Sequence, residues 1–544
     1  MANFVLTYAA AGGSVGIEIE KPSSLVAPAQ VWLRAMDYDG LAPFEESGTV
    51  YDGAHHEYYH EWTINGEPLP AWSKPQNLLA EHNNPNKAYG REVAFVLPEP
   101  GQYVIDLVVT DRLGNQATAS TGTLIVFDPE SYFPPADRIY VDTTGIYSGV
   151  PAASGKVASL EALRTAMASR TSNPTWVLLA RGQSHSLAGV NPTSNDNFKG
   201  VLVFEDNTEV RLISAYGTGA KPVITPETRA DRNFTRPMFE VKRPKTGGWR
   251  TVSGLEFRGD YDPELERGPG DYSSGPQVEN WDISGGFSLF HDIKASGLGK
   301  GYRPGGSSSG GAHHHLIADC GCDGWRDFAS FGGQPGQHLG YVGCSFVQRP
   351  NVPNRGDKDD IRNTHGPIRI SNCAYVYVAQ MDLFSRNHWD GNDQPCLRLF
   401  TRPEAVQTAV VERCSMEGGF ELIHLINSEN TTLHPANILM ERLLLVATTY
   451  TSAFINAQRS GLTLRNSVLI APNVAHLAPS GNSGAVQLTR TGQPEDETAG
   501  VYSNPVAIYG NTYLNLIDAG NDGNALPWPL FKIDPAYDST IIEN

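Results

Sequence analysis

A short hydrophobic pattern recurs through the second half of the chain. Each copy has an apolar residue, two further residues of which the second is polar or glycine, a small or apolar residue, any residue, and a final apolar residue. The copies begin at Val252, Phe290, Ile317, Tyr341, Ile370, Val411, Leu439, Thr463 and Ile508. The shortest spacing between successive copies is 24 residues, and the other spacings are longer by varying amounts. A minimum period with variable insertions indicates a coiled chain whose corners carry loops of different length.

The alternation of a strand breaks once in each copy. Apolar residues of one strand face recur every second position, but the first and fourth residues of a copy are three apart. The residues at the break are Gly254, Asp292, Asp319, Gly343, Asn372, Arg413, Glu441, Arg465 and Gly510. Because Gly, Asn and Asp favour tight bends, we predict two inward-facing strands around each corner, stacked into a solenoid with one core. The alternative, a set of unrelated antiparallel strands, has no reason to repeat the same break.

The segment before the repeats predicts a helix and a buried strand. Ser159 can cap a helix whose Leu160, Leu163 and Met167 share one face. Thr175–Ala180 is a continuous apolar run typical of a buried strand. A helix here would cover the open end of the first coil, which every solenoid must protect.

These features together resemble the right-handed parallel β-helix superfamily, which includes pectate-lyase-like proteins and phage tailspikes. The resemblance rests on Ile139–Asp142, the helix after Ser159, the Ser214–Gly219 phrase and the repeats, and it spans residues 137–544. It implies a right-handed parallel β-helix solenoid with a short N-terminal capping helix. The fold carries lyases, hydrolases, epimerases and adhesins, so it does not fix an activity.

Residues 1–128 follow a different pattern, of short alternating strands separated by polar turns. Strands are expected at 15–19, 31–35, 58–64, 103–115 and 123–127, which predicts an all-β sandwich. The phrases at Trp62–Gly66 and Pro100–Asn115 resemble immunoglobulin-like domains of the polycystic-kidney-disease type, which implies adhesion or spacing. An insertion from Gly66 to Arg91 departs from that family. Residues 129–136 are Pro-rich and are predicted to be a stiff linker.

Composition narrows the class of partner. The net charge of −18 argues against nucleic acid, and no run of 18 apolar residues is present to span a bilayer. The start of the chain lacks the basic and apolar stretches of a signal peptide. Four of the six cysteines, Cys320, Cys344, Cys373 and Cys414, share one repeat position, which suggests small core residues of a protein made in a reducing cytosol, one disulfide being the alternative.

Four long insertions mark the expected functional surface. They are Gly259–Glu279, Gly297–Gly311, Gln348–Gly366 and Ser385–Pro395, and all follow the same repeated corner. They should therefore project from one side of the solenoid, where binding and catalysis usually reside.

The candidate catalytic residues lie in two of these loops. They are Asp357, Asp360, His365, Arg386, His388 and Asp390. Coils stacked about 4.8 Å apart could bring two carboxylates to the separations of about 5–9.5 Å that glycosidases use. Elimination from a uronic acid, with a histidine base and an arginine, is the alternative chemistry, and Ca²⁺ held by Asp357, Asp359 and Asp360 is a further one. The simplest alternative is a solvated acidic loop without chemistry.

Aromatic residues near these loops are candidates for stacking on sugar rings. The predicted substrate-binding residues are Tyr261, Tyr302, Trp325, Trp389 and Arg398, with packing under a loop as the alternative for each aromatic ring. His313–His315 is predicted to be a surface turn without a metal, because consecutive strand residues point to opposite faces. His55, His56 and His60 receive the same interpretation.

We therefore predict a virion surface protein of the tailspike or tail-fibre type that recognises host surface polysaccharide and, as a further step, depolymerises it. The first alternative is a bacterial polysaccharide lyase or glycoside hydrolase of the pectate-lyase-like superfamily. The second is a non-catalytic decoration or adhesin. Expected partners are host glycan, other virion proteins and, as in the tailspikes that the chain resembles, two further copies in a homotrimer. The expected location is the virion surface or the extracellular space.

Overall fold

The structure is a computed structural model. It describes residues 4–10, 13–41, 58–67, 69–74, 80–111, 113–170, 173–190, 201–204, 209–226, 236–242, 248–259, 273–274, 277–279, 286–304, 313–332, 337–347, 367–371, 373–385, 395–401, 408–418, 421–427, 437–447, 451, 453–458, 461–471, 485–489, 506–515, 531–533 and 540–542.

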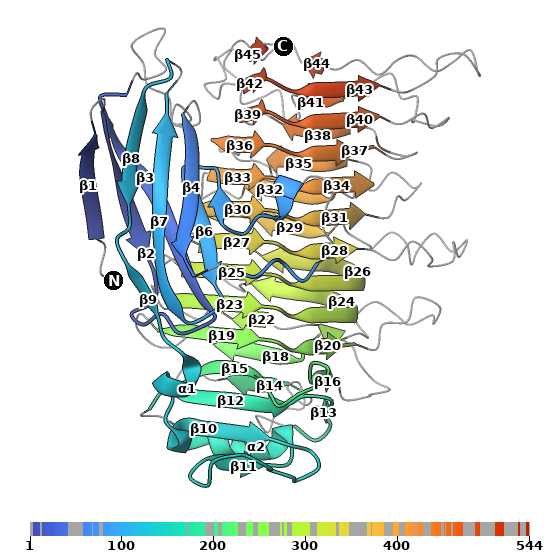
Figure 1. The fold of residues 1–544 in the computed structure, drawn as a ribbon. Coiled ribbons are helices and arrows are strands. Elements are labelled where there is room, and N and C mark those ends of the chain that lie inside the picture. The colour runs from blue at the N-terminus through green and yellow to red at the C-terminus, as the bar shows by residue number, and fades with distance from the viewer. Residues whose placement is uncertain are drawn as a thin grey trace, which may run out of the picture.

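Residues from 138 onward form a solenoid of parallel strands, as predicted (Figure 1). Its strands stack in three columns. The first stack is a 14-stranded parallel sheet in the order β11 (Gly155–Val157), β10 (Arg138–Val141), β12 (Thr175–Ala180), β15 (Val210–Tyr216), β19 (Trp249–Ser253), β23 (Gly286–His291), β25 (His313–Ala318), β27 (Gln337–Val342), β30 (Tyr375–Ala379), β33 (Thr408–Glu412), β36 (Ile438–Glu441), β39 (Leu462–Arg465), β42 (Val506–Tyr509) and β45 (Thr540–Ile542).

The other two stacks are joined by long strands that bend through both of them. The second stack holds β13 (Ser184–Ser186), β16 (Val223–Thr225), β20 (Glu256–Arg258), β24 (Lys294–Pro304), β26 (Gly321–Gly332), β28 (Ser345–Val347), β31 (Asp382–Ser385), β34 (Ser415–Gly418), β37 (Leu444–Val446), β40 (Val468–Ala471) and β43 (Thr512–Asn515). The third holds β14 (Leu202–Phe204), β18 (Phe239–Lys242), β22 (Gln277–Glu279), the later parts of β24 and β26, β29 (Ile368–Ser371), β32 (Leu397–Thr401), β35 (Glu421–Asn427), β38 (Ala453–Gln458), β41 (Val486–Thr489) and β44 (Phe531–Ile533). The short strands β17 (Arg236–Pro237) and β21 (Ser273–Ser274) pair beside β24.

The repeated pattern does mark a corner between the first and second stacks. Nine residues at these corners have left-handed backbone, with φ between 51° and 71°: Gly254, Asp292, Asp319, Gly343, Gln380, Arg413, Arg442, Asn466 and Gly510. The amides of seven of them, from Gly254 to Arg442, hydrogen-bond to the strand of the next coil, as from Asp319 N to Val342 O at 2.9 Å and from Gly343 N to Ala379 O at 3.0 Å. The corners therefore stack in register.

Three of the nine predicted copies need correction. Two have the corner one residue later than predicted, at Arg442 and Asn466. The copy that begins at Ile370 is instead the turn from the third stack into β30, and the true corner of that coil is Gln380. Apolar spacing alone cannot separate two turns that both place apolar residues three apart. Consequently Met381, and not Cys373, lies between Cys344 and Cys414 in the core. All six cysteines are buried and free.

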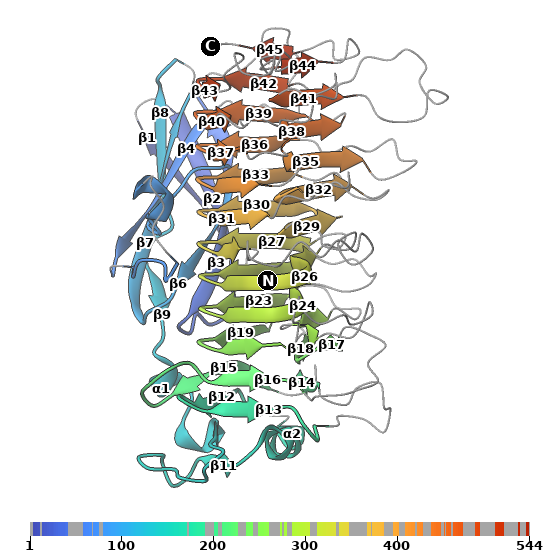
Figure 2. The same ribbon diagram turned by 90° about the vertical axis from the view of Figure 1, so that its right-hand side faces the viewer.

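The predicted helix is α2 (Leu160–Ala168), which lies at the end of the solenoid beside β10 and β11 (Figures 1 and 2). Ser159 caps it by accepting a hydrogen bond from Ala162 N at 3.1 Å, and Leu160, Leu163 and Met167 are buried in the solenoid core. These predictions are confirmed; that the helix protects the open end remains a prediction.

The N-terminal residues form two antiparallel sheets. One has the order β1 (Phe4–Ala10), β2 (Gly13–Glu20), β3 (Ala29–Asp39) and β6 (Glu92–Leu97). The other contains β5 (Lys87–Ala88), β4 (Tyr59–Gly66), β7 (Gly101–Thr110) and β8 (Gln116–Ser120), with β9 (Leu124–Val126) on β7. Their buried side chains form one cluster, so the two sheets share a core. We refer to this unit as the sandwich; that it is an immunoglobulin-like domain of the polycystic-kidney-disease type remains a prediction.

The sandwich packs on the outer face of the first stack (Figure 1). Its apolar cluster continues into outward side chains of the solenoid, including Trp249, Phe287, Leu316 and Tyr377. First-stack strands such as β25 and β27 are therefore buried on both faces. The predicted linker 129–136 contains α1 (Pro129–Tyr132) and the 3₁₀ helix η3 (Pro135–Asp137), and Phe133 between them is fully buried.

This packing corrects the interpretation of the histidines. His313, His314 and His315 form the start of β25 and are each at most 2% exposed, so they are not a surface turn. His60 lies in β4 and is equally buried. His55 and His56 lie outside the described residues. His314 is buried because it lies on the outer face of the solenoid strand, which the sandwich covers. His315 is in register with the core residue Leu339 and so lies on the inward face of the same strand.

The insertion between Gly66 and Arg91 contacts the stacked corners. Trp72 donates from Nε1 to Gln380 Oε1 at 2.9 Å, and Ser73 donates to Asp319 Oδ1 from its amide at 2.7 Å. Gly343 lies beside the same insertion. Its φ is 65°, and a methyl group on its Cα would stand 2.3 Å from the Trp72 ring, so the corner can hold only glycine here. The insertion also includes the 3₁₀ helix η2 (Ala80–Asn83). It thus attaches the sandwich to several coils at once.

We expect the Asp319 contact to make stability depend on pH. Burial raises the pKa of the Asp319 carboxyl from 3.8 to about 6, although the hydrogen bonds from Ser73 lower it. A raised folded-state pKa means that stability is full below the usual pKa and is lost as pH rises through the folded value. Asp319→Asn keeps an acceptor oxygen and tolerates left-handed backbone. Urea unfolding at about pH 4 and about pH 7 should show that the free energy of unfolding falls with pH in the wild type but not in the variant. The expected fall is below about 3 kcal/mol, because Asp319 keeps some solvent contact. Equal pH dependence in both proteins would refute the assignment.

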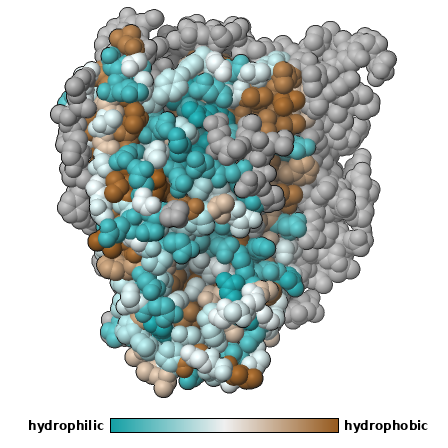
Figure 3. All heavy atoms as spheres, in the orientation of Figure 1, coloured by the Kyte–Doolittle hydropathy of each residue, from teal (hydrophilic) through white to brown (hydrophobic). Residues whose placement is uncertain are grey.

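Neither α1 nor α2 is long and apolar enough to cross a bilayer. On the face seen in Figure 3, hydrophilic and hydrophobic residues are interspersed. The large apolar side chains that are exposed in the described residues are scattered: Tyr59, Leu113, Ile125, Phe127, Ile146 and Leu514.

Candidate functional site

The loops that carry the predicted catalytic residues run between the second and third stacks. Residues 348–366 connect β28 to β29, and residues 386–394 connect β31 to β32. The strands before the two loops are neighbours, with Val347 paired to Phe384, and the strands after them pair Arg369 with Arg398. The two loops therefore leave and rejoin the solenoid on adjacent coils.

Most of the predicted site residues lie outside the described residues. These are Asp357, Asp360, His365, Arg386, His388 and Asp390 of the catalytic set, and Tyr261 and Trp389 of the binding set. Their roles remain predictions.

Two of the predicted sugar-stacking residues belong to the solenoid core. Tyr302 is 0% exposed and donates its hydroxyl to Ile293 O at 3.0 Å. Trp325 is 1% exposed and lies in register with Leu298. Neither ring is available to a ligand, so for these two the packing alternative is correct. Tyr302 was misassigned because β24 continues into the predicted insertion Gly297–Gly311, and Trp325 because it lies in the long strand β26, where no exposed loop begins.

Arg398 is the remaining predicted site residue, and it belongs to a row of polar side chains on the third stack. Strand pairing places Arg369, Arg398, His424, Asn456 and Gln487 at one register position on β29, β32, β35, β38 and β41. We call these five residues the polar row. Each has apolar core residues on both sides, as Arg398 has Leu397 and Leu399. Because side chains alternate along a strand, the row points away from the core.

Glu421 joins the centre of the polar row. Its carboxylate accepts from Asn456 Nδ2 at 2.6 Å through Oε1 and lies 2.9 Å from His424 Nδ1 through Oε2. The side chains of Glu421 and His424 are 5% and 1% exposed. A carboxylate held against an imidazole and an amide is fixed in orientation, and such a pair can take up or release a proton from a bound group. Arg398, next to His424, adds a permanent positive charge on the same face.

The polar row was missed in the sequence, although a signal was present. Each row residue stands between two apolar residues, in Ile368–Ile370, Leu397–Leu399, Ile423–Leu425, Ile455–Ala457 and Val486–Leu488. Each of these tripeptides follows a loop or turn that comes after a corner. Aligning the second strand after each corner would have placed the five polar residues in one column. Only the corner was aligned between copies. Arg398 was therefore proposed for its charge alone, and the other four residues of the polar row were not recognised.

Comparisons with known proteins identify no family. No protein-family model matches the chain, and no curated protein matches it. Solved structures that resemble it include a rhamnogalacturonan lyase, with a TM-score of 0.37 and 12% identity over 67% of this chain and 90% of that one. For a family 28 exopolygalacturonase from Yersinia enterocolitica the TM-score is 0.35 and the sequence identity 9%, over 97% of this chain and 98% of that one. For the tailspike of E. coli bacteriophage HK620 the TM-score is 0.34 and the identity 10%, over 69% of this chain and 67% of that one. Similarities this low carry no argument about what this chain does.

Proposed function

We propose that the solenoid is the glycan-binding part of a virion surface protein of the tailspike or tail-fibre type, and that the polar row is its binding face. The proposal rests on one observation: guanidinium, imidazole, amide and carboxylate groups are aligned over five coils, and the two candidate loops lead into the first two of these strands, β29 and β32. A glycan chain is long and repetitive, and a column of hydrogen-bonding groups repeated at strand spacing suits such a ligand.

The location of the sandwich supports this choice of face. The outer face of the first stack is buried under the sandwich from β12 to β36, so a ligand has no access to it there. The strands that follow residues 348–366 and 386–394 in the sequence are instead β29 and β32 of the third stack, which carry Arg369 and Arg398. Two arginines close together favour an acidic sugar, because a guanidinium binds a carboxylate through two parallel hydrogen bonds.

Cleavage of the glycan is the second candidate, and the Glu421–His424 pair is the observation that favours it. Glycoside hydrolysis needs a second carboxylate at about 5–9.5 Å, which Asp357, Asp360 or Asp390 would have to supply. Elimination would use an arginine to neutralise the uronate and His424 as base, and this requires that a bound glycan uncover the His424 side chain, which is 1% exposed. In a non-catalytic adhesin, Glu421 would only orient His424 and Asn456.

The test is binding to purified capsular and surface polysaccharides, with and without uronic acid. Arg398→Ala should weaken binding at least about tenfold, since it removes a charge-assisted hydrogen bond worth about 1.5–3 kcal/mol. The control is Arg258→Ala, because Arg258 lies on β20 of the second stack and pairs with Glu256 at 2.6 Å. Equal binding by the wild type and both variants would refute the polar row as the binding face.

A second readout separates binding from cleavage. New reducing ends without ultraviolet absorbance would indicate hydrolysis, and a new unsaturated uronate would indicate elimination. If either product forms, Glu421→Gln should reduce its rate by at least about 100-fold while binding persists. Retained binding with no product from the wild-type protein would make the chain an adhesin.

A further inference from the structure

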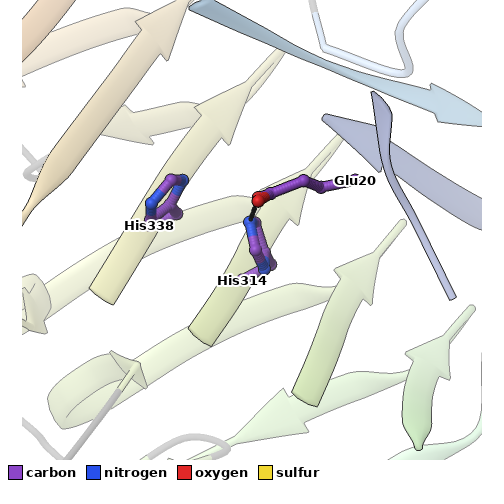
Figure 4. A group of neighbouring side chains, drawn as sticks. All are labelled: Glu20, His314 and His338. Carbon is purple, nitrogen blue, oxygen red and sulfur yellow. Dashed lines mark ion pairs between the residues drawn. The ribbon is translucent and has the colours of Figure 1, made fainter. Parts of the chain in front are cut away.

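A second cluster of functional groups lies where the sandwich meets the solenoid. Glu20 comes from the end of β2, and His314 and His338 come from β25 and β27 (Figure 4). Their ligand atoms all lie within 4.8 Å of one another. It is the only group of three such residues among those that the structure describes. None of the three belongs to the polar row.

The parallel register brings the two histidines together. His314 and His338 are paired residues on adjacent strands, and their ring centroids are 4.6 Å apart. Consecutive residues such as His313 and His314 face opposite sides, but residues one full coil apart face the same side. The 24-residue spacing of these two histidines equals the shortest repeat of the solenoid.

The two imidazoles are held in place by aromatic packing. Trp32 of the sandwich contacts both rings edge-on, with centroid distances of 5.3 Å to His314 and 5.9 Å to His338. Phe287 stacks on His314 at 4.7 Å from the other side. Rings fixed in this way lose little rotational freedom when they bind a ligand, which favours tight binding.

The groups around the cluster leave one nitrogen atom of His338 without a hydrogen bond in the described residues. Glu20 and His314 are in direct contact, whereas Nδ1 of the buried His338 makes no hydrogen bond within the described part of the chain. The nearest further carboxylate is Glu92, whose Oε1 lies 3.9 Å from His338 Nδ1. Arg34 is also close, but its charge is balanced by Glu92 at 2.5 Å and Glu18 at 3.4 Å.

We propose that Glu20, His314 and His338 bind a divalent transition-metal ion of the zinc class, which ties the sandwich to the first stack of the solenoid. Two imidazole nitrogens and a carboxylate oxygen are ligands that zinc prefers, with bonds of about 2.0–2.2 Å. Tetrahedral ligands are then about 3.3 Å apart, so the present spacing needs only small side-chain rotations. Glu92 or a water would complete the coordination.

Metal binding is tested on the full chain purified without a polyhistidine tag. After incubation with Zn²⁺ or Co²⁺ and removal of free metal, the wild type should retain one ion per chain by elemental analysis, and bound Co²⁺ should show visible ligand-field absorption. Zn²⁺ at a hundredfold excess over its Kd should raise Tm by about 2 °C, reversibly with a chelator.

Variants then locate the ion. Glu20→Gln and His338→Gln should each lower zinc affinity by more than about tenfold, since even the loss of a residue that only supports a ligand costs that much. His291→Gln is the control, because His291 lies on the same stack and instead contacts Ser253 Oγ at 3.1 Å. Far-UV circular dichroism checks that the variants fold, and Glu20, at the surface end of the cluster, is the less disruptive site. A wild type that retains no ion, or variants that bind zinc as the wild type does, would overturn the proposal.

Discussion

Replacing Glu412 by glutamine is expected to destabilise the protein by about 3–5 kcal/mol, because it leaves a buried charge without its partner. Glu412 is 0% exposed and lies at the junction of sandwich and solenoid. It accepts hydrogen bonds from Arg413 Nη2 at 2.8 Å, Tyr377 Oη at 2.8 Å and Tyr89 N at 2.7 Å. The side chain of Arg413, at the corner, is only 1% exposed.

Urea unfolding followed by circular dichroism measures this loss. The control is Glu256→Gln, whose partner Arg258 is 59% exposed, so the change should cost less than about 1 kcal/mol. The double variant Glu412→Gln with Arg413→Gln should lose less than the sum of the two single variants, because no lone charge remains buried. Additive losses would show that the two side chains do not act as a pair.

The second large effect is expected in the solenoid core, where Trp325→Ala should cost about 3–5 kcal/mol. Trp325 is 1% exposed and packs in the same cluster as Leu298 and Tyr302. Removal of a large ring from a closely packed interior leaves a cavity that the rigid coils on both sides cannot fill.

Thermal and urea unfolding measure this loss of stability. Polysaccharide binding below the unfolding temperature tests whether Trp325 lies in the core or on the binding surface. Leu514→Ala is the matched control, since Leu514 is 43% exposed and its truncation should cost about 0.5 kcal/mol or less. A folded Trp325→Ala protein with unchanged stability and reduced glycan binding would instead restore Trp325 to the binding surface.

The repeat pattern predicted most of the solenoid corners at the correct residue. Six of nine copies were aligned correctly, and five of these have glycine or aspartate at the corner, where local energetics favour left-handed backbone. The other corners include Arg413, Arg442 and Gln380, whose residue types do not favour such a backbone. Stacking against neighbouring coils imposes the conformation on them.

The functional residues were harder to find than the corners. Arg398 was found through its charge, but Glu421, His424 and Asn456 become a group only through strand pairing and a hydrogen bond between residues on different coils. Tyr302 and Trp325 were misassigned, because an aromatic residue near glycines suits an exposed loop as well as a bent core strand. Burial decides between the two, and burial is a property of the stacked coils.

By itself the sequence determined the parallel solenoid, the helix after Ser159 with its buried face, the two-part division of the chain and most corners. Each of these follows from local periodicity and capping, which a single chain displays directly. Only the tertiary structure decided which face of the solenoid is covered, that the insertion after Gly66 contacts the corners, and that Glu20 meets His314 and His338. Those contacts join residues up to about 320 positions apart, and no local pattern encodes a partner at that distance.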